Sequence, residues 1–124
     1  MPTKVLLVED MEINRDMLSR RLEKRGFEVV TAVDGEEGVR KAKEESPDII
    51  LMDMNLPVMD GWEATKAIKE CGQTRHIPVI ALTAHSITKS RDATMDIGCD
   101  EYETKPVDFK RLVAKMEDLV SHRT

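Results

Sequence analysis

Five short apolar runs alternate with segments of helical periodicity along the whole sequence, and this alternation most constrains the fold. The runs, which we interpret as β-strands, are residues 4–8, 28–33, 48–52, 79–82 and, more weakly, 102–104. Strands that alternate strictly with helices pair in parallel, because each helix carries the chain back before the next strand begins. The pattern therefore predicts an α/β protein with a five-stranded parallel sheet and five helices that cover both of its faces.

The segments between the runs carry apolar residues at helical spacing. In the first segment, which Gly26 ends, four residues are expected on one buried face: Ile13, Met17, Leu18 and Leu22. The segment of about residues 86–96 has the weakest apolar stripe, so its helix is expected to pack loosely and to shift easily. The last segment has the clearest stripe and begins after Asp108, a natural N-cap.

Length and composition favour one domain over residues 1–124. A chain of 124 residues can bury most of its apolar surface without disulfides or a structural metal. Its formal charge of −5 is spread along the chain without a basic stripe, which argues against direct nucleic-acid binding. The nearest basic cluster, Lys110, Arg111 and Lys115, is interpreted as the solvated face of the last helix. Cys71 and Cys99 fit no metal or disulfide pattern and are expected to be free thiols.

Polar residues follow four of the five predicted strands at the point where each strand ends. They are Glu9 and Asp10, Asp53, Thr83 and Lys105. The carboxyl ends of parallel strands form the ligand crevice of an open α/β sheet. We therefore expect these side chains to meet at one edge, where they make sense together as a phosphoryl-transfer site.

Three carboxylates at one edge would repel one another strongly, so a cation is needed to neutralise them. Mg²⁺ suits the site because it prefers oxygen ligands and keeps several waters. Lys105 and the Thr83 hydroxyl would supply positive charge and a hydrogen bond to a transferred phosphoryl group. Asp53 is then the candidate nucleophile, because a carboxylate can form an acyl phosphate.

The same residues give the chain a resemblance to a known family. The sequence resembles the response-regulator receiver domains of two-component signalling, in particular the single-domain type similar to chemotaxis regulators. The likeness rests on four motifs in family order and at compatible spacing: Val8-Glu9-Asp10; Leu51-Met52-Asp53 with Leu56-Pro57-Val58-Met59-Asp60-Gly61; Leu82-Thr83-Ala84; and Lys105-Pro106. It implies a flavodoxin-like, doubly wound sheet of strand order 2-1-3-4-5, the order that receivers of this kind exemplify.

The resemblance also implies a ligand set for the metal. Asp10 and Asp53 would bind Mg²⁺, or Mn²⁺ in its place, directly, together with the backbone carbonyl of Asn55. Glu9 would act mainly through a water molecule. Asp53 would accept its phosphoryl group from a phospho-histidine on a histidine kinase or a histidine phosphotransfer protein.

Further roles follow from the resemblance for residues beside the acceptor. Thr83, the backbone N–H of Ala84 and Lys105 would hold the phosphoryl oxygens, and the peptide bond before Pro106 would be cis. Tyr102 occupies the position of the family's switch aromatic: Thr83 would move toward the phosphoryl group and leave space into which Tyr102 rotates. The output surface for a downstream effector protein would be the fourth helix, the fifth strand and the fifth helix.

Two residues are candidate modulators of the phosphoryl lifetime. Asn55 and His85 each lie two positions beyond a site residue, where they could flank the path of the attacking water. His85 has two readings: a solvent-exposed start to the fourth helix, or a contact with the water or the phosphoryl oxygens.

These expectations describe a signalling switch rather than an enzyme, because the chain would catalyse only its own phosphorylation and dephosphorylation. An FMN-binding flavodoxin would need a first loop rich in Ser, Thr and Gly, whereas this one begins Glu9-Asp10. A haloacid-dehalogenase-like phosphatase would need a second Asp where Asn55 stands. No apolar stretch has membrane-spanning length, so a cytoplasmic location without membrane contact is expected. The expected state is a monomer or weak dimer. The last helix lies at the end of the sequence, which favours a stand-alone regulator, with a part of a longer, DNA-binding regulator as the alternative.

Overall fold

A computed structural model of the chain describes residues 3–54, 56, 58–83 and 98–121. Its strands form a single five-stranded sheet. They are β1 (Lys4–Val8), β2 (Glu28–Ala32), β3 (Ile49–Asp53), β4 (Val79–Thr83) and β5 (Glu101–Thr104). All four pairings are parallel, and the order is β2-β1-β3-β4-β5, as the resemblance implied. The strand bounds differ from the expected ones by one residue at several ends, so Asp53 and Thr83 are the last residues of their strands.

Four helices lie in the described part of the chain. They are α1 (Glu12–Lys24), α2 (Gly35–Glu45), α3 (Gly61–Glu70) and α5 (Phe109–Ser121). The helix expected at about residues 86–96 falls outside the described residues. None of the described helices is both long enough and apolar enough to cross a membrane.

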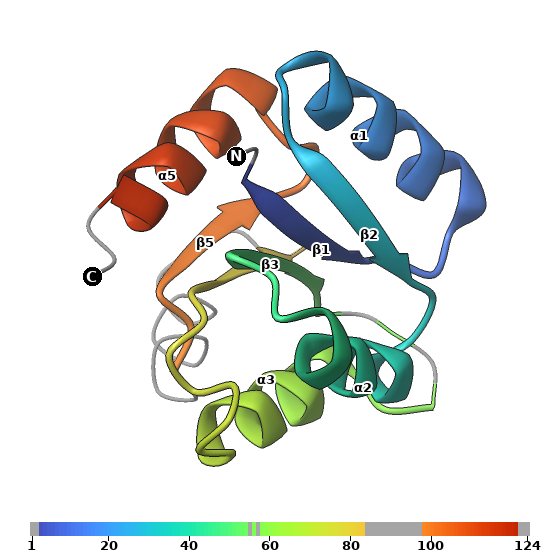
Figure 1. The fold of residues 1–124 in the computed structure, drawn as a ribbon. Coiled ribbons are helices and arrows are strands. Elements are labelled where there is room, and N and C mark those ends of the chain that lie inside the picture. The colour runs from blue at the N-terminus through green and yellow to red at the C-terminus, as the bar shows by residue number, and fades with distance from the viewer. Residues whose placement is uncertain (1–2, 55, 57, 84–97, 122–124) are drawn as a thin grey trace.

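The helices cover the sheet in two layers. Helices α1 and α5 lie on one face, and α2 and α3 lie on the other (Figure 1). Alternate residues of each central strand point to opposite faces. Val5 and Leu7 therefore pack with α1 and α5, whereas Leu6 and Val8 pack with α2 and α3, and all four are fully buried. Burial of β1 and β3 on both faces makes the sheet a rigid platform for the loops that follow these strands.

The single buried face expected for α1 is wrong. Leu22 is fully buried, but Ile13 and Met17 are 74% and 52% exposed. At about 100° per residue, Ile13 and Leu22 lie on roughly opposite sides of the helix, so the four apolar residues form two stripes. Only the stripe with Leu18 and Leu22 packs on the sheet.

Aspartates cap three of the four described helices at the carboxyl edge of the sheet, α2, α3 and α5. Asp34 accepts a hydrogen bond from the Glu37 amide at 2.8 Å, and Asp60 accepts one from the Glu63 amide at 2.9 Å. Asp108 caps α5 as expected, accepting from the Arg111 amide at 3.1 Å. Such caps satisfy amides that have no partner within the helix. Asp60 is therefore structural, although its place in a family motif allowed a role in the site.

Candidate functional site

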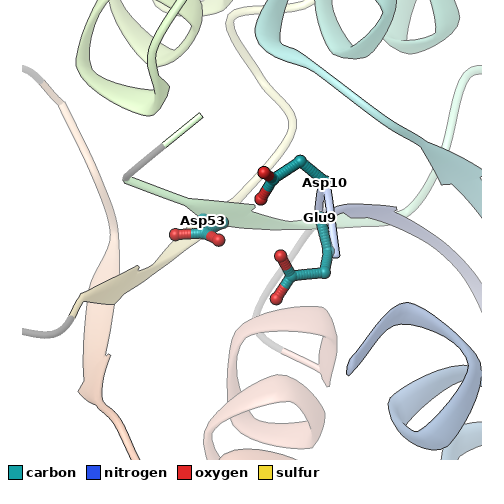
Figure 2. Close-up of side chains that lie close together, drawn as sticks. All are labelled: Glu9, Asp10 and Asp53. Atoms are coloured by element: carbon teal, nitrogen blue, oxygen red, sulfur yellow. The ribbon is translucent and has the colours of Figure 1, made fainter. Parts of the chain in front are cut away.

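Three carboxylates meet at the carboxyl edge of the sheet. Glu9 and Asp10 follow β1, and Asp53 ends β3; Figure 2 shows their side chains facing a common space. One oxygen from each lies within 4.8 Å of the others. Glu9 and Asp53 are 4% and 2% exposed, whereas Asp10 is exposed to solvent. The predicted acidic cluster is confirmed as a cluster of mixed burial, with Asp10 at its open side.

Backbone hydrogen bonds hold the acidic segment after β1 in place. The Glu9 amide donates to the carbonyl of Ala32 at 3.0 Å, which extends the pairing of β1 with β2. The Met11 amide donates to Glu9 Oε2 at 3.2 Å, and Arg15 donates to the carbonyls of Glu9 and Asp10 at 3.0 and 3.2 Å. These bonds therefore hold the Glu9 side chain and the backbone of both acidic residues in place before any ligand binds.

Close backbone packing fixes the acceptor strand from the other side. A Cβ atom built on Gly61 would lie 2.2 Å from the carbonyl oxygen of Asp53 and 2.6 Å from the Met54 Cα. The start of α3 can therefore approach the end of β3 only because residue 61 has no side chain. Gly61 is therefore a structural residue at the start of α3.

Lys105 approaches the acceptor along the carboxyl edge from the end of the edge strand β5, on the side of β3 away from β1. Its Nζ lies 3.0 Å from Asp53 Oδ2. The Lys105 amide donates to the carbonyl of Thr83 at 2.8 Å, and the peptide bond between Lys105 and Pro106 is cis, as expected. The structure thus brings together Glu9, Asp10, Asp53 and Lys105, and it places the buried Thr83 at the end of β4, the strand beside β3.

Burial perturbs one group of the cluster strongly. The pKa of Glu9 is raised from 4.5 to about 7, chiefly by desolvation, and the hydrogen bond and negative charge of Asp53 contribute to the rise. The Met11 amide and the positive charge of Lys105 act in the opposite direction. The cluster without a metal therefore holds one carboxyl whose pKa lies near neutral pH, chiefly because burial disfavours its charged form.

The donor set fits a hard divalent cation. It contains only carboxylate oxygens, which Mg²⁺ and similar ions prefer. Direct ligands of one octahedral Mg²⁺ lie at most about 4.2 Å apart, given metal–oxygen distances of about 2.1 Å. The three carboxylate oxygens lie within 4.8 Å of one another, close enough for one cation and its bound waters to join them.

A cleft of about 330 Å³ opens beside the cluster, between α1 and the segment that follows β5. Glu9 and Lys105 line its inner end, and Met17, Leu18 and Val107 contribute apolar walls. The charged groups around Asp53 are therefore accessible from a partly apolar cleft.

Comparison with known proteins identifies the family to which this sheet and its acidic cluster belong. The family model for the response regulator receiver domain matches residues 5–117. The chain belongs to the response-regulator receiver family. A receiver of this family is a signalling domain of two-component systems, which agrees with the acidic cluster and the strand order found here.

Relatives and solved structures agree with the family assignment. The polar-differentiation response regulator DivK of Brucella anthropi is 38% identical over 113 residues, which span 91% of this chain and 92% of the relative. A similar solved structure is the receiver domain of a sensor histidine kinase from Pseudomonas aeruginosa, which has a magnesium ion coordinated in its active-site cleft. Its TM-score is 0.89 and its sequence identity is 33%. The match covers 98% of this chain and 99% of that one.

A third similar structure contains a phosphotransfer partner. It is a co-crystal from Saccharomyces cerevisiae of a histidine phosphotransfer signaling protein with the receiver domain of its downstream response regulator. The matching chain has a TM-score of 0.90 and 31% identity, and the match covers 97% of this receiver and 90% of that chain.

Sequence reasoning missed an ion-pair cluster next to Tyr102. Glu103 is 1% exposed and pairs with Arg111 at 2.6 Å and with Lys115 at 3.0 Å. Lys115 also donates to the Tyr102 carbonyl at 2.7 Å and lies 5.3 Å from the centre of its ring. Arg111 is exposed, as a solvated face requires, but that interpretation is incomplete, because Arg111 and Lys115 also compensate the charge of a buried carboxylate. The strand contains two glutamates, Glu101 and Glu103, and its sequence does not show which of them is buried.

Several expected site residues fall outside the described residues. They are Asn55, Ala84 and His85, together with the helix expected at about residues 86–96. Tyr102 lies within β5 and is half-buried against the core on the α2 and α3 side. Cys71 and Cys99 are free thiols, as expected.

Proposed function

We propose that this receiver accepts a phosphoryl group on Asp53 from a phospho-histidine in a reaction that requires Mg²⁺. The observation that carries the proposal is the placement of the Asp53 carboxylate between the Lys105 ammonium at 3.0 Å and two further carboxylates within 4.8 Å. A carboxylate so placed has a cation on one side for phosphoryl oxygens and an oxygen-rich site for a metal on the other.

The chemistry is an in-line displacement at phosphorus. An Asp53 oxygen forms a bond to the phosphorus while the bond from phosphorus to the donor histidine nitrogen breaks, and the nitrogen leaves with the electron pair. Bound Mg²⁺ would neutralise charge on the carboxylates and on the phosphoryl oxygens. Lys105, the Thr83 hydroxyl and the Ala84 N–H would bind the equatorial oxygens, where charge lies in the transition state.

Asp10, Asp53 and the carbonyl of Asn55 are the proposed direct ligands of the metal, and Glu9 is the ligand that acts through water. The exposed position of Asp10 and the burial of Glu9 support this division, because a buried carboxyl with a pKa of about 7 is the least ready to meet an ion directly. The magnesium ion in the similar Pseudomonas aeruginosa receiver supports the choice of Mg²⁺. Mn²⁺ is expected to replace it because its ligand preference is similar.

Phosphorylation would shift a two-state equilibrium of the domain. Thr83 would move toward the new phosphoryl group, and Tyr102 would rotate into the space that Thr83 leaves. The surface formed by the segment of about residues 86–96, β5 and α5 would then contact a downstream effector protein. Hydrolysis of the acyl phosphate would reset the switch, with Asn55 and His85 as candidate modulators of its lifetime.

The donor would be a histidine kinase or a histidine phosphotransfer protein, and the protein would act in the cytoplasm as a monomer or weak dimer. The yeast complex between a phosphotransfer protein and a similar receiver supports this class of partner. The test is a transfer assay with purified kinases and phosphotransfer proteins, each carrying radioactive phosphate on histidine. The proposal expects at least one donor to transfer its label to this chain within minutes. Absence of transfer from every donor would contradict it.

A further inference from the structure

Side chains bind both backbone polar groups of Tyr102 at the edge of the sheet. β5 is the last strand in the order β2-β1-β3-β4-β5, so one of its two sides has no neighbouring strand (Figure 1). The Tyr102 amide donates to Glu101 Oε1 at 3.1 Å, and the Tyr102 carbonyl accepts from Lys115 Nζ at 2.7 Å. Such partners are what the unpaired groups of an edge strand require. Lys115 therefore ties α5 to the backbone of the expected switch residue.

The Lys115 ammonium also has a fixed position beside the Tyr102 ring. Its Nζ lies 3.0 Å from Oε2 of the buried Glu103 and 3.7 Å from Glu101 Oε1, and the side chain is only 25% exposed. From this position Nζ lies 5.3 Å from the centre of the Tyr102 ring, within the range of cation–π attraction. Oxygen atoms of three consecutive residues of β5 thus hold the ammonium where it attracts the ring.

Arg111 shares the buried carboxylate with Lys115 but not the contact with the ring. Its Nε donates to Glu103 Oε1 at 2.8 Å, and its side chain is 55% exposed. In the described part of the chain, no hydrogen bond or ring contact joins Arg111 to Tyr102. The two basic residues therefore have a common structural role in compensating Glu103, and Lys115 has the further contact with Tyr102.

The contact between Lys115 and the ring depends on where the ring lies. Tyr102 pairs with Ala81, and both pack against the core on the α2 and α3 side. Alternate residues of a strand share a face, so Thr83 points to the same side. Rotation of Tyr102 into the space left by Thr83 would carry the ring toward β4, away from the free edge. The bond of Lys115 to the Tyr102 carbonyl would remain, whereas its contact with the ring would be lost.

We propose that Lys115 is a positioning residue that holds the Tyr102 ring in its unphosphorylated position and so sets how readily the switch turns. The inference rests on the proposed function and adds a restraint from α5 to it. A contact biases a two-state equilibrium only if it differs between the states, and the ring contact does. Its loss should shift the equilibrium about twofold to fivefold toward the rotated state, the range of a partly exposed cation–π contact. By linkage, the affinity of Asp53 for a phosphoryl mimic changes by the same factor.

The test observes Tyr102 directly. The chain contains one tyrosine, so incorporation of 3-fluorotyrosine gives a single fluorine resonance in NMR spectra. The probe is beryllofluoride with Mg²⁺, a stable mimic of a phosphoryl group, and its titration should move this resonance in the wild type. The half-saturating concentration of beryllofluoride should fall about twofold to fivefold in Lys115→Met, because the ring no longer has to leave the ammonium. Lys115→Arg keeps a cation at this position and should stay close to the wild type.

Two further variants separate this role from the ion pairs of Glu103. Arg111→Met removes the other cation beside Glu103 and should leave the half-saturating concentration unchanged. Lys115→Met with Glu103→Gln removes the ring contact without an undercompensated carboxylate and should show the same fall as Lys115→Met. An unchanged concentration in both Lys115 variants, or an equal fall in Arg111→Met, would overturn the role of Lys115. No response of the wild-type resonance to beryllofluoride would contradict the proposed switch itself, and with it this inference.

Discussion

Lys105 Nζ lies 3.0 Å from Asp53 Oδ2, although Asp53 ends β3, Lys105 follows β5, and β4 lies between those strands. The Asp53 carboxylate is almost fully buried, and the lysine side chain is 30% exposed. Lys105 can therefore compensate the negative charge of Asp53 while its own ammonium remains partly hydrated. A phosphoryl group on Asp53 would place its oxygens where this ammonium could bind them.

Lys105→Ala should slow phosphorylation of Asp53 by acetyl phosphate by about tenfold to a hundredfold. This loss in rate is no larger than the usual loss when one preorganised hydrogen-bond donor is removed from an active site. Phosphorylation should still occur, because the carboxylate and the metal ligands remain. The signal should fail to reach the segment of about residues 86–96. Amide hydrogen exchange of that segment, measured with and without phosphorylation, checks this. Lys66→Ala on α3 is the control, and equal protection changes in wild type and Lys105→Ala would contradict the role of Lys105.

Asp10→Asn should stabilise the protein without metal and weaken its response to metal. Removing one of three clustered carboxylates relieves repulsion, so the melting temperature in EDTA should rise by about 2–5 °C, the scale of a modest electrostatic contact in a domain of this size. Millimolar Mg²⁺ should raise the melting temperature of the wild type, because a ligand of the folded state stabilises it. Differential scanning calorimetry measures both effects. Asp16→Asn on α1 is the control, and an unaltered Mg²⁺ response in Asp10→Asn would rule Asp10 out as a ligand.

The raised pKa of Glu9 predicts how stability without metal depends on pH. The folded-state pKa of about 7 exceeds the ordinary value of 4.5, so the folded protein binds this proton more tightly than the unfolded chain. The resulting stabilisation is complete below about pH 4.5 and is lost as the pH rises through about 7. Melting temperatures in EDTA between pH 5 and 8 should therefore fall more steeply in the wild type than in Glu9→Gln. Parallel curves for the two proteins would show that Glu9 does not titrate in this range.

Much of the fold follows from patterns that tolerate little ambiguity. β1 and β3 are continuous apolar runs because both of their faces are covered, and the helical periodicity of α5 gives one wide stripe. The site could be predicted because strand ends in a parallel sheet share one edge, which brings Asp10, Asp53 and Lys105 together from distant parts of the chain.

Other structural features depend on tertiary contacts, which the spacing of apolar residues in the sequence does not determine. The exposure of Ile13 and Met17 follows from which stripe of α1 faces the sheet, and the sequence offers two. The left-handed conformation of Val58 opposes its residue preference, so no local rule predicts it. The pairing of Glu103 with Arg111 and Lys115 depends on the distance between β5 and α5 in the folded protein.

This pairing predicts a large effect of a single lysine on stability. Lys115→Met would leave the buried Glu103 carboxylate with Arg111 alone and should cost about 1–3 kcal/mol of unfolding free energy, the usual penalty for a buried group that loses a partner. Adding Glu103→Gln should recover part of this loss, because the remaining side chain is neutral. Urea denaturation measures the unfolding free energies of the wild type, Lys115→Met and the double variant. Lys110→Met, at an exposed position of the same helix, should change stability by less than about 0.5 kcal/mol.

The central claim is that Asp53 is the phosphoryl acceptor of a Mg²⁺-dependent switch, and direct labelling tests it. The purified protein is incubated with acetyl phosphate and Mg²⁺, and the bound phosphate is located by mass spectrometry after reduction of the acyl phosphate with borohydride. The account predicts one phosphoryl group on Asp53, stable in acid and labile in base, that is absent in excess EDTA and in Asp53→Asn. Undiminished labelling of Asp53→Asn, or labelling that persists in excess EDTA, would contradict it.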